Sequence, residues 1–230
     1  MNTSLVISKP SRLGLLVQIV VILCLIPVGL TLGALTGVIV LSPIMGMALP
    51  LLAATWFLRR DGLGWKDVGF AKPMRLSRFL VMTAAAVLSA YLLVILLLGP
   101  LVEAAGLPPQ DLSSLKVLIE GNTVYFRMFL LPVSWGSAAF GEELLVRGFL
   151  LNRLECAAQS PAIAVVGQAA IFALAHTYQG VTGALMVFVV GLVFGVVFLR
   201  SGRNLWPVIV AHGIIDTIAI TSIYLGADWV

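Results

Sequence analysis

LGLLVQIVVILCLIPVGLTLGALTGVIVLSPIMGMALPLLAATWFL, residues 13–58, contains no charged side chain. The run is about twice as long as the roughly 20 apolar residues that one helix needs to cross a bilayer. Pro43 and Pro50 interrupt it, and proline favours helix ends and kinks. The stretch therefore predicts two membrane-spanning helices. Lys9 and Arg12 precede it, as in a signal peptide, but the apolar run simply continues, so we expect an uncleaved first span.

The composition of the whole chain agrees with this interpretation. Apolar residues make up 60% and charged residues 10% of the 230 residues, and the mean hydropathy is +1.10, far outside the range of soluble domains. Further apolar runs lie at about 79–99, 126–150, 161–178, 183–200 and 205–225. The sequence predicts an all-α, polytopic membrane helix bundle of about seven transmembrane helices, with six to eight allowed. We expect one membrane domain over residues 1–230.

Basic residues give the expected orientation. In the seven-helix arrangement one side receives Lys9, Arg12, Arg59, Arg60, Lys66, Lys72, Arg75, Arg78, Arg147, Arg153, Arg200 and Arg203. Cytoplasmic loops carry the excess of Lys and Arg, so that side and the N-terminus should face the cytoplasm of a cell membrane. The net charge of +4 then reflects topology and attraction to anionic membrane lipids, and it gives no support to nucleic-acid binding.

Ionisable residues inside the predicted spans are the most informative feature. Such side chains cost several kcal/mol in a bilayer unless they are paired or functional. The first three spans contain none in their interiors, whereas the later spans contain Glu142, Glu143, Arg147, His176, His212 and Asp216. Any chemistry should therefore lie in the C-terminal half of the chain.

The spacing of these residues suggests roles. Glu143 and Arg147 are four apart, in the favourable order for an ion pair on one helical face, and they could serve only to fix helix packing. Glu142 is rotated by about 100° from Glu143, which leaves it as the unpaired carboxylate. A free carboxylate in an apolar site suits a general base that activates water.

The two histidines complete the set. His176 follows Phe172 by four residues on the same predicted helical face, and alone it could serve only to hydrogen-bond a neighbouring helix. His212 and Asp216 are also four apart, a spacing usable for metal binding or for orienting a histidine. Two histidines and two carboxylates on three helices supply what water activation and oxyanion stabilisation require.

These residues resemble three ordered motifs of the CPBP (Abi) family of intramembrane proteases, which includes the type II CAAX prenyl endopeptidases and proteins linked to bacteriocin immunity. GEELLVRGFL at 141–150 resembles the EExxxR motif, and FALAH at 172–176 resembles the FxxxH motif. NLWPVIVAH at 204–212 resembles the approach to the last motif, HxxxN, carried here by His212 and Asp216. The resemblance covers about residues 120–220, the motif-bearing catalytic part.

The resemblance implies an intramembrane endopeptidase. Glu142 and His176 would activate the attacking water, and His212 with Asp216 would stabilise the oxyanion or help to bind a metal. Glu143 and Arg147 would support the site. Asparagine is common where this chain has Asp216, and an ionised carboxylate would repel an oxyanion, so Asp216 is protonated, orients His212, or is a metal ligand.

The sequence does not decide whether the site binds a metal ion. Two histidines and one or two carboxylates are adequate ligands for a divalent metal such as zinc, which would use Glu142, His176, His212 and Asp216. HExxH is absent, however, and the ligands would come from three helices, so glutamate-activated water without metal is favoured.

The expected substrate is a membrane-associated peptide, prenylated if the resemblance extends that far, which enters a cavity open towards the cytoplasm. The expected partners are membrane lipids and this lipid-modified peptide, without nucleic acid. Two alternatives remain: a proton-coupled transporter, in which the same residues relay protons, and a non-catalytic immunity or scaffold protein with the same fold. Matched helix breaks in two halves would favour the transporter, and we find none.

Overall fold

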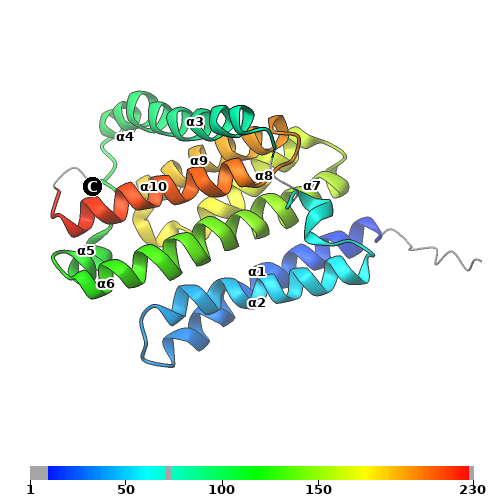
Figure 1. Ribbon diagram of the computed structural model, residues 1–230, viewed down its shortest axis with the longest axis horizontal. Helices are drawn as coiled ribbons and strands as arrows, with labels where there is room; N and C mark the ends of the chain where they lie inside the picture. The colour runs from blue at the N-terminus through cyan, green and yellow to red at the C-terminus, as the bar shows by residue number, and fades with distance from the viewer. Residues whose placement is uncertain (1–9, 71–73, 228–230) are drawn as a thin grey trace, which may run out of the picture.

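The computed structural model describes residues 10–70 and 74–227, and these residues form an all-helical bundle without a strand (Figure 1). The all-α membrane fold is confirmed. Its N-terminal helices are α1 (Arg12–Ala34), α2 (Leu41–Arg60), α3 (Leu76–Leu92), α4 (Gly99–Ala104), α5 (Ser113–Ile119) and α6 (Thr123–Met128). The C-terminal ones are α7 (Leu151–Ala158), α8 (Pro161–Leu174), α9 (Gly180–Arg200) and α10 (Trp206–Tyr224).

Five helical stretches are long and apolar enough to cross a membrane. They are Arg12–Ala34, Leu41–Arg60, Leu76–Ala104, Thr177–Arg200 and Trp206–Tyr224. The stretch 13–58 thus forms two spans, as predicted, and α1 and α2 meet where the backbone of α2 leaves no room for side chains at Gly29 and Gly33. The five stretches make the chain an integral membrane protein.

The two other predicted spans correspond to helices of a different kind. The run near 126–150 belongs to one long helix that starts with α6 and ends with α7, and this helix carries the intramembrane glutamates. The run at 161–178 corresponds to α8, which ends at Leu174 and is only about 21 Å long. A helix of that length is shorter than the roughly 30 Å hydrocarbon core. The count of seven is therefore approximate.

The motif-bearing helices lie in the middle of the bundle. Figure 1 shows α10 between α3 and the α6–α7 helix, and α1 and α2 on the far side of that helix. α9 packs against α8 and α3, and α8 packs against α7. Each helix that carries or leads into a motif therefore has other helices on more than one side.

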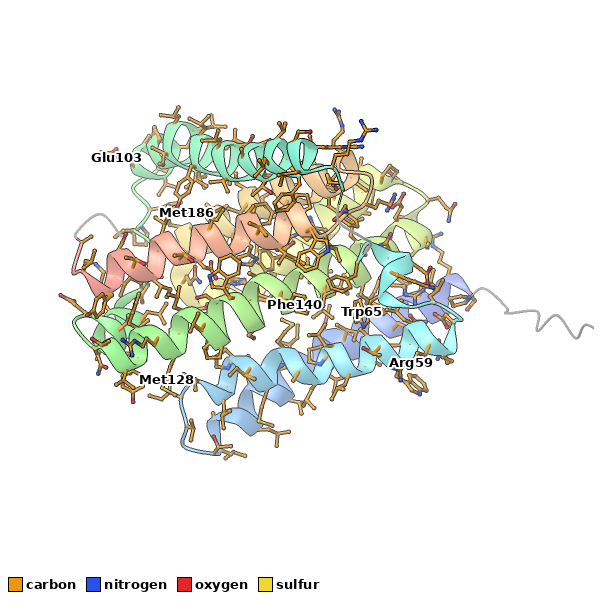
Figure 2. All side chains as sticks on the ribbon, viewed as in Figure 1. Arg59, Trp65, Glu103, Met128, Phe140 and Met186 are labelled. Carbon is orange, nitrogen blue, oxygen red and sulfur yellow. The ribbon has the colours of Figure 1, made fainter. Side chains whose placement is uncertain are left out.

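Basic residues gather at one end of the bundle. α1 and α3 begin there, α2, α7 and α9 end there, and Figure 2 shows Arg59 at this end with Glu103 and Met128 at the other. Arg153 pairs with Asp61 across 2.9 Å. Lys9 and Lys72 lie outside the described residues. Arg147 was predicted among this group but is fully buried within the bundle.

The loop after α2 lies on this basic end. Its short 3-10 helix η1 (Trp65–Val68) is attached to the bundle by Trp65, whose indole N–H donates to Thr55 Oγ1 at 3.1 Å. Gly69 follows with φ 118°, a conformation that favours glycine, and its carbonyl accepts from the backbone N–H of Leu205 at 3.0 Å. The loop thereby fixes the start of α10, the helix that carries His212.

Candidate active site

The two glutamates lie on an unusual part of the long central helix. Its backbone is π-helical over η3 (Phe129–Glu142) and η4 (Leu144–Leu150), so Glu143 lies between two π-helical stretches. Such turns occur frequently at functional sites. Gly141 precedes the glutamates, and a Cβ there would lie 2.5 Å from Met47 Cγ of α2. The helix is therefore held closely against α2 at the start of the first motif.

Glu143 is the centre of a buried charge cluster. Its Oε1 lies 2.8 Å from Arg147 Nη1 and 2.9 Å from His212 Nδ1, and no part of the Glu143 or Arg147 side chain is exposed. The contact with Arg147 agrees with their spacing in sequence, whereas the contact with His212 joins residues 69 positions apart. One carboxylate thus links the first and third motifs.

Arg147 is enclosed by aromatic rings. Its guanidinium carbon lies 4.7 Å from the ring centroid of Phe172 and 5.3 Å from that of Phe194. Its Nη2 donates to the carbonyl of Gly191 at 3.5 Å. A planar guanidinium suits this combination of stacking and hydrogen bonding. Arg147 therefore joins the long helix to α8 and α9.

Glu142 has a different environment from its neighbour. The residue is half-buried, and its Oε2 is buried without a hydrogen-bond partner among the described residues. Glu142 lies within electrostatic range of Asp216 and Tyr178. A buried carboxylate oxygen without a partner is costly, and in native proteins it calls for a functional explanation or a bound water molecule.

His176 lies outside the helix predicted to carry it. Because α8 ends at Leu174, the residue begins the turn before η5 (Thr177–Gln179), with φ −108°. Its Nδ1 is 2.8 Å from the carbonyl oxygen of Phe172, so Nδ1 carries the proton that this bond requires. Nε2 is then the nitrogen left for chemistry. The ring also packs edge-on against Phe172 at 4.7 Å between centroids.

His212 and Asp216 lie on α10. His212 Nε2 is 3.7 Å from Asp216 Oδ1, on the opposite side of the ring from Glu143. His212 is buried, whereas 26% of the Asp216 side chain is exposed. Asp216 is within electrostatic range of Glu142, Glu143 and His176 as well. The residues singled out from the sequence are therefore brought into one neighbourhood.

Three further residues, which sequence reasoning missed, hold η3 against α10. Trp135 donates its indole N–H to Thr217 Oγ1 at 3.1 Å. Its ring covers Gly213, where a Cβ would lie 2.5 Å from Trp135 Cη2. These contacts flank His212 and Asp216 on α10. The only sequence signal was Gly213 itself, placed directly after the motif histidine.

Gln168 is a fourth residue that sequence reasoning missed. It is fully buried on α8, and its amide nitrogen donates to the carbonyl oxygens of Val165 at 2.9 Å and Gly191 at 2.8 Å. The carbonyl of Gly191 thus accepts from both Gln168 and Arg147. A polar residue in an apolar span was the available signal.

The donor set does not suit a metal ion in this arrangement. Among the described residues no group of three or more His, Cys, Asp or Glu side chains is placed so that it could hold one. Metal binding by these residues would therefore need a rearrangement of their side chains.

The fold and this neighbourhood define a polytopic membrane protein with an intramembrane acid–histidine site. Residues 124–218, which contain all three motifs, match the family described as type II CAAX prenyl endopeptidase Rce1-like. This segment is similar to the CAAX-type prenyl endopeptidases, and the match supports the family predicted from the motifs. No curated protein and no solved structure matches the chain.

Proposed function

We propose that the protein is an intramembrane endopeptidase in which Glu142 and His176 activate the water that attacks a peptide bond. The observation that carries the proposal is the buried Oε2 of Glu142, which has no hydrogen-bond partner among the described residues. Oε2 of the adjacent Glu143 also has no partner, but Glu143 is fully enclosed and its Oε1 binds Arg147 and His212, so we assign the water to the half-buried Glu142. Glu142 is thus the carboxylate suited to accept a proton from water.

The proposed reaction proceeds through a tetrahedral intermediate. Glu142 takes one proton of the water while the water oxygen bonds to the carbonyl carbon, and the electron pair of the C=O π bond moves to the carbonyl oxygen. Collapse of the intermediate restores C=O, breaks the C–N bond and passes the proton from Glu142 to the leaving amine. His176, held through Nδ1 by the Phe172 carbonyl, accepts a hydrogen bond from the water at Nε2 and orients it.

His212 is proposed to stabilise the oxyanion. Its ring lies between Glu143 at Nδ1 and Asp216 near Nε2, an arrangement that favours the doubly protonated imidazolium. The Nε2 proton is then available to an oxyanion. In this proposal Asp216 is a partner that orients His212, while Glu143 and Arg147 keep the imidazole and the long helix in register.

The proposed substrate is a membrane-associated peptide that is lipid-modified, with a prenyl group as the first candidate. The family description names prenyl endopeptidases, and a bundle with many exposed apolar side chains lies among membrane lipids. Following the positive-inside rule, we propose that the arginine-rich end faces the cytoplasm of a cell membrane and that substrate enters from there. His212 lies about 9 Å along α10 from that end.

The test is cleavage of prenylated and unprenylated membrane-anchored peptides by the purified protein in detergent. Wild type is compared with Glu142→Gln and His176→Ala, each with and without a chelator. We expect cleavage to fall by at least ~100-fold in both variants and to be unaffected by chelation. Activity that survives both substitutions would refute the site, and chelator-sensitive activity restored by zinc would refute the metal-free mechanism.

The same preparation separates this function from the alternatives. If wild type cleaves none of the peptides, its proton flux is measured in liposomes. Flux that depends on Glu142 would identify a proton-coupled transporter, and the absence of both activities would favour a non-catalytic immunity or scaffold role.

A further inference from the structure

Tyr178 is a polar side chain beside the proposed site that belongs to none of the three motifs. It lies in η5, two residues after His176, and the ring centroids of the two residues are 5.8 Å apart at an angle of 32°. The side chain is not enclosed by protein, since Tyr178 is 68% exposed. The phenol therefore lies against the histidine proposed to orient water and remains reachable by a substrate.

The hydroxyl oxygen of Tyr178 accepts a hydrogen bond from a neighbouring amide. Gln179 Nε2 donates to its oxygen at 2.9 Å, and Gln179 Oε1 in turn accepts from Gln110 Nε2 at 2.7 Å. Because the phenol oxygen is the acceptor in this chain of bonds, its own proton remains available for donation. The amides thus prepare Tyr178 as a hydrogen-bond donor.

The turn that carries Tyr178 is fixed from outside the matched segment of the family. The backbone N–H of Asp111 donates to the carbonyl of Gln179 at 3.0 Å, and Thr182 Oγ1 donates to the carbonyl of Pro108 at 2.5 Å. Gln179 and Thr182 are both buried. The loop between α4 and α5 therefore limits the motion of His176 and Tyr178 together.

Asp216 creates a need for such a donor. An ionised carboxylate has no proton to donate and would repel a developing oxyanion, whereas acyl-transfer sites stabilise that charge with preorganised donors. Tyr178 lies beside His176 and within electrostatic range of both Glu142 and Asp216. Its hydroxyl is thus placed where a donor is missing.

We propose that the Tyr178 hydroxyl is a catalytic hydrogen-bond donor to the oxyanion of the tetrahedral intermediate, which supplies the donor that Asp216 cannot. The phenol keeps its proton throughout, so no bond to it forms or breaks; the hydrogen bond strengthens as the carbonyl oxygen gains charge and weakens again when C=O is restored. This inference rests on the proposed peptidase function.

The experiment uses Tyr178→Phe, which keeps the ring against His176 and removes only the hydroxyl. Steady-state cleavage is measured with whichever membrane-anchored or prenylated peptide the wild type cleaves. We expect kcat to fall ~100-fold, the scale for losing one oxyanion donor, while KM changes less than about threefold. Tyr125→Phe, in helix α6 and outside the proposed site, is the matched control and should retain wild-type kcat.

A double-mutant cycle tests the link to Asp216. Asp216→Asn provides an amide N–H donor on the same residue, so the loss of kcat caused by Tyr178→Phe should shrink to about tenfold or less in that background. The thermal midpoint of each variant in detergent is measured in parallel. Tyr178→Phe should leave it unchanged, because the ring contact persists.

Three results would overturn the inference: wild-type kcat in Tyr178→Phe, an effect confined to KM, or an equal loss of kcat in both backgrounds. Glu142→Gln separates this failure from failure of the proposed function. If Glu142→Gln is inactive while Tyr178→Phe keeps full activity, the peptidase assignment stands and only the role of Tyr178 is wrong. If wild type cleaves no peptide, both fall together.

Discussion

His212 Nδ1 lies 2.9 Å from Glu143 Oε1, not beside the Glu142 that precedes it. The same oxygen binds Arg147 at 2.8 Å, so one buried carboxylate meets two groups that can carry positive charge. Two adjacent glutamates thereby have different environments. Both glutamates keep a buried Oε2 without a hydrogen-bond partner among the described residues, but Glu143 is fully enclosed and paired through Oε1, whereas Glu142 is only half-buried.

The adjacent glutamates should respond differently to the same substitution. Glu143→Gln leaves the buried Arg147 without its counter-charge, and breaking a buried pair in this way costs about 3–5 kcal/mol. We expect a lower thermal midpoint in detergent together with loss of cleavage. Glu142→Gln, the matched control, should lose cleavage at an unchanged midpoint. Equal midpoints for the two variants would contradict the structural role of Glu143.

The sequence predicted the parts of the site that depend on helical periodicity. Glu143 and Arg147, and His212 and Asp216, are four residues apart, and each pair lies close in the bundle because both stand on helices. The apolar runs likewise predicted the helices, because length and composition alone determine whether a segment can cross a membrane.

What the sequence could not provide depends on packing. The contact between Glu143 and His212 needs the relative position of two helices, which no local pattern encodes. Trp135 is one aromatic residue in an apolar run, and only the close approach of Gly213 gives it a role. The early end of α8 moved His176 into a turn; Gly180, with φ 78°, was the nearby signal for that turn.

Arg147→Lys should behave as a disruptive change. Lysine keeps the charge but cannot stack between Phe172 and Phe194 or reach Glu143 and the Gly191 carbonyl with separate N–H groups. We expect a thermal midpoint several degrees lower than wild type and at least ~10-fold weaker cleavage. The control is Arg200→Lys, an exposed residue in the last turn of α9, which should change neither. Wild-type stability of Arg147→Lys would show that charge alone is sufficient at this position.

Gly213→Ala tests the packing of η3 on α10. The new Cβ would lie 2.5 Å from Trp135 Cη2, and overpacking of this kind costs about 1–3 kcal/mol. Displacement of Trp135 would also stretch its bond to Thr217. We expect a lower thermal midpoint and slower cleavage, because the position of His212 on α10 shifts relative to the glutamates on the long helix.

Gly167→Ala is the matched control for that substitution. Its Cβ would meet Leu154 Cδ1 at 3.4 Å, an ordinary contact, and alanine is favoured over glycine inside a helix by roughly 1 kcal/mol. Its midpoint should equal or exceed that of wild type. A similar response of both variants would indicate a general intolerance of alanine in this bundle, without a specific role for the Trp135 contact.

Cysteine labelling tests the proposed orientation and the side from which the site opens. Cys24 is replaced by Ala in both variants. The first variant keeps Cys156, which is exposed near the arginine-rich end. The second carries Cys156→Ser and Val117→Cys, which places its single cysteine on α5. A membrane-impermeant maleimide should label Cys156 only after the cells are permeabilised, and the Val117→Cys variant in intact cells. The reverse labelling pattern would show that the bundle has the opposite orientation in the membrane.

A third variant, Thr177→Cys in the cysteine-free background, reports on the turn beside His176. Entry from the cytoplasm, as proposed, predicts labelling only in permeabilised cells and protection by a competing peptide substrate. This turn is hydrogen-bonded through Gln179 to Gln110 in the loop after α4. A site that opens on the side of that loop would therefore give a different labelling pattern. Labelling of Thr177→Cys in intact cells, together with Val117→Cys, would place the opening on the side of that loop and would make substrate entry from the cytoplasm untenable.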